Sequence, residues 1–330
     1  MGRNLIFKLL PILLVFLLFS CKPKPLDIDI SPAEEKMVIS SQLLFQQGIA
    51  INLTKSFSSL DNIKNGEGGY SEEFLNNISI KNAIVTVTYN NITDTLTMLE
   101  SSPGVYYSLT VLQYVYQDYL LMVWDSYLKK YISASSTLLP KVNFNSIESE
   151  NSSKSTENSF IVNYTIKDLD YVNNWYMVSY SKLVNGKRFS LKRSLLPKNI
   201  PINKSTFIIQ NPEAEEIELF TDNNALNNII SRSKKLTDVS STDTVIVALI
   251  NVEEGYYNFL NTKIKAGGLA NSFGNEPINY KTNVNGGYGF FTTHSPSVVF
   301  LNASGKLDIS SLENIDTSIL NFTENEIKIK

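Results

Sequence analysis

The sequence predicts a mainly β protein with two sandwich-type domains and one amphipathic helix late in the second domain. Three observations lead to this fold class. β-branched and aromatic residues, which favour pleated surfaces, are abundant. The strand candidates are short, alternate in polarity and are separated by turn residues, which is typical of antiparallel sandwiches. Only one segment of the mature chain, residues 253–265, clearly changes to helical spacing.

The first domain is assigned to residues 31–142. Residues 83–89 alternate cleanly and predict a half-buried strand, and Glu72–Asn76 predicts a single helical turn. Residues 120–124 and 127–134 flank Asp125-Ser126 and predict a hairpin. The remaining strand candidates are residues 37–44, 49–53, 95–99 and the segment that follows Pro103-Gly104.

The second domain is assigned to residues 143–330. Its strand candidates are residues 160–166, 175–183, 205–210, 244–251, 283–292 and 297–301, the last two completing its sheet. Short helices are expected at 213–219 and 224–231, and a solvated loop at 149–159.

The helix of the second domain is expected at 253–265. Glu253 and Glu254 suit its amino end, because acids there favour the helix dipole, and Gly267-Gly268 supplies its stop. We expect Tyr256, Leu260 and Ile264 to pack on the second sheet.

Residues 1–20 have the pattern of a secretory signal peptide. Arg3 and Lys8 make the start basic, and the apolar run that follows is shorter than the roughly 20 residues of a membrane-spanning helix. Cys21 directly follows Ser20 in a bacterial lipobox pattern, which predicts cleavage between them and acylation of Cys21 by diacylglycerol and a further chain such as palmitate. Residues 21–30 then form the lipidated cysteine and its tether. The alternative is an ordinary signal peptide with an accidental cysteine.

Composition argues against several chemistries. The net charge of −3 offers no basic field for nucleic acid, and the single cysteine cannot form an internal disulfide. One histidine, His294, cannot build a multi-histidine metal centre, and we expect it to be an exposed loop residue. We expect no catalytic residues, metal or cofactor. Solvated faces explain the Glu72-Glu73, Glu215-Glu216-Glu218 and Glu253-Glu254 clusters, and residues 286–291 suggest tight strand packing rather than a phosphate loop.

Aromatic residues crowd one stretch of the first domain, between Tyr106 and Tyr131. Most of them belong in a sandwich core. The remainder could form a contact patch for a partner, because tyrosine combines an apolar ring with a polar tip. The candidates for this partner contact are Tyr106, Tyr116, Tyr119 and Trp124.

The order of landmarks resembles that of a known family. They are the lipobox, Lys36–Ile39, Ala83–Val87, Ser102–Tyr106, Leu138–Pro140, Asp243–Val245, Tyr256–Leu260, Asn275–Pro277 and Gly286–Phe291. Together they resemble the Bacteroidetes outer-membrane lipoproteins called domain of unknown function 4249, across nearly the whole mature chain. The chain departs from that pattern at Asp125-Ser126, where the family has a glycine turn, and in the polar insert 149–159.

The resemblance implies an outer-membrane lipoprotein whose first sandwich is immunoglobulin-like or transthyretin-like. It also implies a non-enzymatic accessory role beside a TonB-dependent, SusC-type transporter in nutrient uptake, on the periplasmic or the outer face of the membrane. A surface binding module or adhesin without a transporter is the alternative. A third class, a hydrolase built on His294 and the Glu215-Glu216 pair, would require those side chains to act together.

Overall fold

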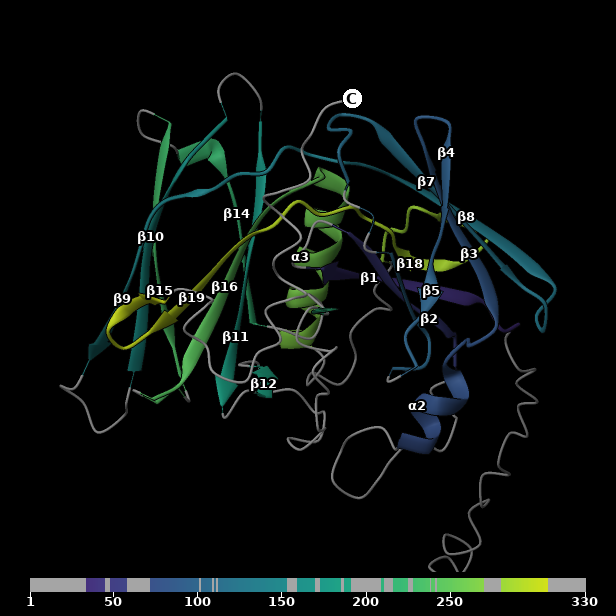
Figure 1. Ribbon diagram of the computed structural model, residues 1–330, viewed down its shortest axis with the longest axis horizontal. Helices are drawn as coiled ribbons and strands as arrows, with labels where there is room; N and C mark the ends of the chain where they lie inside the picture. Colours follow the sequence, from purple (N-terminus) through teal and green to yellow (C-terminus); the bar gives the residue numbers. More distant parts are fainter. Residues whose placement is uncertain are drawn as a thin grey trace, which may run out of the picture. The chain divides into compact units, whose positions relative to one another are not determined.

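Two pairs of facing sheets and a helix make up the fold in the computed structural model (Figure 1). From Glu35 onward the chain forms one compact unit. The mainly β fold class with sandwich domains is therefore confirmed. The structure describes residues 34–44, 48–57, 72–100, 102–108, 110, 112–152, 159–169, 173–184, 187–190, 209–210, 216–224, 228–237, 239–240, 242–269 and 280–307.

The first sandwich packs a sheet of order β13-β1-β2-β6-β5, with β18 added beside β1, against a sheet of order β17-β8-β7-β3-β4. The strands of the first sheet are β1 (Met37–Leu44), β2 (Ile49–Lys55), β5 (Thr97–Met98), β6 (Val105–Ser108), β13 (Ile209–Gln210) and β18 (Tyr288–Phe290). Those of the second sheet are β3 (Ala83–Tyr89), β4 (Ile92–Thr95), β7 (Asp118–Asp125), β8 (Lys130–Thr137) and β17 (Val284–Asn285). Ile39, Leu53, Val87 and Leu121 are fully buried between the two sheets.

The second sandwich packs a three-stranded sheet, β15-β10-β9, against a sheet of order β12-β11-β16-β19-β20, with β14 also paired to β11. The three strands are β9 (Phe144–Ser152), β10 (Ser159–Lys167) and β15 (Ile229–Leu236). The larger sheet contains β11 (Trp175–Val184), β12 (Lys187–Ser190), β14 (Glu216–Thr221), β16 (Thr244–Val252), β19 (Ser297–Asn302) and β20 (Gly305–Leu307). Phe160, Tyr164, Tyr176 and Val247 fill the space between the sheets.

The helix α3 (Glu254–Leu269) lies between the two sandwiches (Figure 1). Its buried Tyr256, Phe259 and Leu260 share one apolar cluster with residues of β16 and with Leu43 of β1. The predicted helix is confirmed, but the expected stop at Gly267-Gly268 is wrong, because the helix includes both glycines and ends at Leu269. The predicted stripe is wrong at Ile264, which is largely exposed, because the packed face turns toward Phe259.

Residues 284–290 return to the first sandwich, so the prediction that 283–292 complete the second sheet is wrong. β17 pairs with β8, and β18 runs parallel to β1. Gly289 has a φ of +91°, and a Cβ there would lie 1.8 Å from the carbonyl oxygen of Ile39. A side chain cannot fit between the strands, which agrees with the tight packing expected for this glycine-rich segment.

Three expectations for the second domain also require correction. The described part of the 213–219 helix is strand β14, in which acidic residues alternate with Ile217 and Leu219. The prediction of a helix at 224–231 is wrong, because β15 begins at Ile229 and a short 3-10 helix, Asp222–Asn224, precedes it. Ser149–Ser152 extend β9 where a loop was expected, since an edge strand can turn polar side chains outward.

The other local expectations for the described residues are confirmed, apart from two strand assignments. Residues 95–99 do not form one strand, because β4 ends at Thr95 and β5 contains only Thr97–Met98. The second strand of the hairpin, expected from residue 127, begins at Lys130 after a turn. The hairpin joins β7 to β8, α2 (Glu72–Ile78) provides the helical turn, and β10, β11 and β16 fall where they were expected. The leader, the tether, and most of the 205–210 strand lie outside the described residues.

Candidate functional site

The outward face of the β17-β8-β7-β3-β4 sheet carries a row of apolar side chains along β7. β7 alternates buried Tyr119, Leu121 and Val123 with Leu120, Met122 and Trp124, which point away from the core. The register places Trp124 between Ile84 of β3 and Tyr131 of β8, and its ring stacks on Tyr131 at 4.2 Å between centroids. We call Ile84, Leu120, Met122, Trp124 and Tyr131 the outer apolar face.

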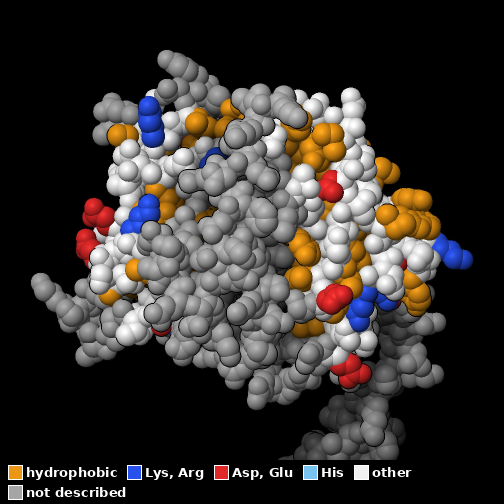
Figure 2. Space-filling view, viewed as in Figure 1, with side chains coloured by type: hydrophobic (Ala, Val, Ile, Leu, Met, Phe, Trp, Pro, Cys, Tyr) orange, Lys and Arg blue, Asp and Glu red, His pale blue; other side chains and the backbone are white. Residues whose placement is uncertain are grey.

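Positions that point outward from a sandwich are usually polar, so a contiguous apolar set marks a contact surface. Figure 2 shows hydrophobic side chains on the side of the molecule where Figure 1 labels β7, β8 and β3. The residues of the outer apolar face come from three adjacent strands of one rigid sheet, so they form a flat platform rather than a flexible loop. Such a platform suits a protein partner better than a small ligand.

The four predicted contact aromatics do not form one surface. Tyr106 and Tyr119 are buried in the core, which rules them out as surface contacts. The Tyr106 hydroxyl accepts from the Ala83 amide and donates to the Ile80 carbonyl, so burial costs it no hydrogen bond. Tyr116 is exposed in a turn with a φ of +60°, and of the four only Trp124 belongs to the outer apolar face.

Sequence reasoning therefore missed most of this face. Aromatic density alone cannot separate the two sides of a strand. The useful signal was the run 119–124, which is apolar at both odd and even positions although its sheet has only one buried side.

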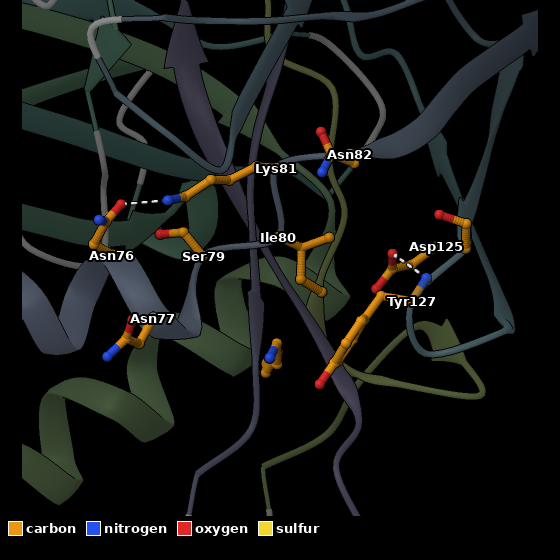
Figure 3. A pocket seen from close by; sticks show the side chains of 10 residues that line it. Asn76, Asn77, Ser79, Ile80, Lys81, Asn82, Asp125 and Tyr127 are labelled. Atoms are coloured by element: carbon orange, nitrogen blue, oxygen red, sulfur yellow. Dashed lines mark hydrogen bonds between the residues drawn. The ribbon is translucent and has the colours of Figure 1, made fainter.

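A polar hollow of about 280 Å³ opens beside the hairpin (Figure 3). One wall comes from α2 and the segment after it, with the amides of Asn76, Asn77 and Asn82. The opposite wall comes from Asp125 and Tyr127 of the hairpin (Figure 3). We call this hollow the amide pocket.

Local contacts hold the walls of the amide pocket. The Lys81 ammonium donates to Asn76 Oδ1 at 2.5 Å, and the Tyr127 amide donates to Asp125 Oδ1 at 3.1 Å. The Lys55 ammonium lies 4.9 Å from the centre of the Tyr127 ring, within cation–π range. Both lysines are thus engaged with a neighbouring side chain.

His294 is buried rather than exposed, so the expectation of a loop histidine at the surface is wrong. Its ring lies 5.6 Å from that of Tyr256, centroid to centroid, and neither ring nitrogen has a hydrogen-bond partner in the described part of the chain. Burial lowers its pKa to about 4, so the neutral ring is the stable form in the fold.

Hydrogen bonds fasten the segment around His294 to the first sandwich. The Thr292 amide donates to Ser41 Oγ at 2.7 Å, and the Thr293 amide donates to Ser136 Oγ at 2.9 Å. Ser136 Oγ donates to Glu253 at 2.6 Å, and burial raises the pKa of that carboxyl. Glu253 is therefore part of a structural junction and not of a solvated face.

Glu218 is held in a similar way in the second sandwich. It accepts hydrogen bonds from the guanidinium of Arg232 and from the hydroxyls of Tyr164 and Tyr180. Burial raises the pKa values of both tyrosines. Glu216 pairs separately with a lysine, and His294 packs against Tyr256 of α3, so Glu216 and Glu218 do not lie beside the histidine.

Cys21 and Ser20 lie outside the described residues, so the lipobox stays a prediction. No helix among the described residues is long and apolar enough to cross a membrane. Within the same ranges, no three histidine, cysteine, aspartate or glutamate side chains gather as metal ligands.

The profile of the family described as Domain of unknown function (DUF4249) matches residues 23–298. The chain belongs to the DUF4249 family. The match begins just after Cys21 and ends within β19, so it includes both sandwiches and the segment that returns to the first. No curated protein matches this DUF4249 chain.

Solved structures similar to the DUF4249 chain are distant. The FN1–FN3 domains of chicken CNTN1 match at 11% identity and a TM-score of 0.24, covering 68% of this chain and 62% of that one. The chicken interferon gamma receptor alpha chain matches at 10% identity and a TM-score of 0.19, over 66% and 88% of the two chains. A Bacteroides uniformis protein, provisionally described as carbohydrate-binding, matches at 9% identity and a TM-score of 0.21, covering 68% of this chain and 90% of that one. Scores this low assign no ligand to the DUF4249 chain.

Proposed function

We propose that this chain is a non-enzymatic lipoprotein of the outer membrane that acts as an accessory to a TonB-dependent transporter. The outer apolar face is the observation that carries the proposal. It exposes Met122, Trp124 and Tyr131 on one rigid sheet, where a partner would remove them from water. Each square ångström of apolar surface so buried contributes about 25 cal/mol, before the costs of association.

The lipobox supplies the second part of the proposal. Acyl chains on Cys21 contribute about 0.8 kcal/mol for each buried methylene, so two or more chains make a stable anchor. Anchoring raises the effective concentration of the protein beside a membrane partner, and a modest contact face is then sufficient for stable association. The buried hydrogen bonds of Glu218 and Glu253 give these carboxylates structural tasks, which supports a role without catalysis.

Membrane extraction tests this role directly. Cells that produce the chain are solubilised in mild detergent, and we expect a TonB-dependent transporter to purify with it. Met122→Glu should weaken this association, because it places a charge in the outer apolar face. Ile229→Glu on β15 is the matched control, since the two side chains are 44% and 42% exposed. Capture of the transporter by wild type and Ile229→Glu alone supports the proposal.

Recovery of the chain without a transporter would contradict the accessory role. Protease shaving of intact cells then distinguishes the adhesin alternative, which requires display on the outer surface. Labelling with palmitate and Cys21→Ala tests the anchor separately: the label should disappear in the variant. An unlabelled wild-type chain would remove the membrane part of the proposal.

A further inference from the structure

We propose that the amide pocket binds a neutral carbohydrate, as a single sugar ring or the end of a longer chain. The pocket lies between α2 and the β7–β8 hairpin, and it is separate from the outer apolar face. This inference goes beyond the proposed accessory role and does not depend on the transporter. It stands on the amide lining of the pocket and the exposed ring at its side.

The amides match the hydrogen bonding of sugar hydroxyls. Each asparagine side chain offers two donors and a carbonyl acceptor, and each hydroxyl both donates and accepts. Asn76, Asn77 and Asn82 line the same hollow, and Ser79 adds a hydroxyl (Figure 3). Asn76 already accepts from Lys81, which fixes its carbonyl and leaves its two N–H donors. A ligand with several hydroxyl groups can therefore form hydrogen bonds to several of these side chains at once.

Tyr127 supplies an aromatic platform beside these amides. Its side chain is 77% exposed, although it lines the pocket together with the buried Ile80. The C–H groups on one face of a sugar ring are weakly positive and stack on the negative face of an aromatic ring. The backbone amide of Tyr127 donates to Asp125, so the turn that carries the ring is fixed in the hairpin.

The charged groups of the pocket are the Lys55 and Lys81 ammonium groups and the Asp125 carboxylate. Asp125 is buried at the wall and would repel a phosphate or carboxylate, whereas the lysines would attract one. The ammonium of Lys81 is held by Asn76, and that of Lys55 lies against the Tyr127 ring, so an anion is the competing ligand that the experiment must distinguish. A carboxylate beside amides can also accept from sugar hydroxyls, so Asp125 suits a polyol.

The size of the pocket agrees with this ligand class. Small-molecule sites commonly enclose about 300–1,000 Å³, and this hollow of about 280 Å³ lies just below that range, which suits a single ring. Tyr127 is exposed at the side of the hollow, so a sugar at the end of an oligosaccharide can enter while the rest stays in solvent.

Ligand-observed NMR tests the proposal on the full chain in a sugar-free detergent. The probes are methyl glycosides of glucose, galactose, mannose, xylose and N-acetylglucosamine at about 10 mM, which reveals millimolar dissociation constants. We expect saturation transfer to at least one glycoside. Tyr127→Ala and Asn82→Ala should each weaken that binding about tenfold or more. Tyr116→Ala, which removes a comparably exposed tyrosine outside the pocket, should change it less than about twofold.

Three results would overturn the proposal. The first is no transfer to any glycoside by a chain whose circular dichroism and thermal unfolding show it folded. The second is binding that survives both pocket substitutions. The third is displacement of the glycoside by inorganic phosphate at equal concentration, which would identify an anion site. If no transporter purifies with the chain but a glycoside still binds to it, the accessory role is contradicted and the sugar site remains supported.

Discussion

The two sandwiches share an architecture but differ in the outward side chains of their strands. In the first, the outward positions of β7 carry Leu120, Met122 and Trp124. In the second, the outward positions of β9 and β10 are polar apart from Ile161. The Asn163 amide donates to Glu150 at 3.1 Å, and Ser146 and Thr165 share a hydrogen bond of 2.7 Å. Inward positions are apolar in both.

The second sandwich has mostly polar outward positions on β9, β10 and β15, with Ile161 and Ile229 as exceptions, so an extended apolar exterior is not a requirement of this architecture. The apolar exterior of the first sandwich therefore needs another explanation, and contact with a partner provides one. The comparison also locates the parts of the molecule whose loss should affect stability and those whose loss should affect association alone.

The largest expected effect comes from the strand that closes the first sandwich. Gly289→Ala should cost about 4 kcal/mol or prevent folding, because its Cβ would collide with the carbonyl of Ile39. Gly305→Ala in the β19–β20 hairpin is the control, since its φ is also positive, at +118°, but no atom lies within 4 Å of the added Cβ. Urea unfolding measures both. Equal losses would show that backbone strain, and not the close strand contact, decides the effect.

The junction between the sandwiches should give the chain an acid sensitivity. His294 has a pKa of about 4 in the fold against an ordinary 6.5, so the unfolded chain binds the proton more readily. Stability from this group is fully present above pH 6.5 and falls as the pH drops to about 4, by roughly 3 kcal/mol in total.

Urea unfolding at pH 7, 5 and 4 checks this pH dependence. His294→Phe should flatten the profile over that range while it keeps an aromatic ring beside Tyr256. Glu253→Gln serves as a contrast, because the raised pKa of Glu253 favours the fold as the pH falls. An unchanged slope in His294→Phe would mean that other groups control the acid response.

A smaller effect is expected from the ion pair of the second sandwich. Arg232→Met should cost about 1–2 kcal/mol, because Glu218 is mostly buried and would lose its cation. Lys234→Met removes the partner of Glu216, whose carboxylate is more exposed than that of Glu218, and should cost less than about 0.5 kcal/mol. Thermal unfolding of the two variants gives the comparison. Similar losses would show that burial of Glu218 contributes little.

The smallest effect on stability should come from the outer apolar face itself. Met122→Glu should change the free energy of unfolding by no more than about 0.5 kcal/mol, because the side chain is already exposed. The same variant should bind less of an apolar fluorescent dye than wild type, and Ile229→Glu should not differ as much. A large loss of stability in Met122→Glu would mean that this face supports the fold.

Local patterns predicted much of this structure. Alternation identified β3, β10, β11 and β16, and helical spacing with acids at its start identified α3. Glutamates were a misleading signal in β14, where Glu216 and Glu218 alternate with apolar residues at the strand period. Glutamate favours helices by propensity, and the tertiary context of β11 outweighed that preference.

Nonlocal features could not be predicted in the same way. Whether Tyr119 or Leu120 faces the core depends on register, which pairing with β3 and β8 sets. His294 is polar and sits among threonines and serines, so its sequence context indicates a surface loop. Its burial follows from Ser41 and Ser136, which are distant in sequence and satisfy the backbone of that segment. The amide pocket likewise joins α2 to a hairpin far along the chain.

The pairing of β18 with β1 sets an order for folding. The Thr292 amide and Ser41 are 251 residues apart, so the first sandwich gains its last strands only when nearly all of the chain is present. Contacts of such separation slow folding, because a long loop must close before they form. A chain released amino end first, from a ribosome or through a translocation channel, must keep its first sheets open until β18 emerges. Truncation after residue 142 should therefore yield an incomplete sandwich with an unsatisfied strand edge, which is prone to aggregate.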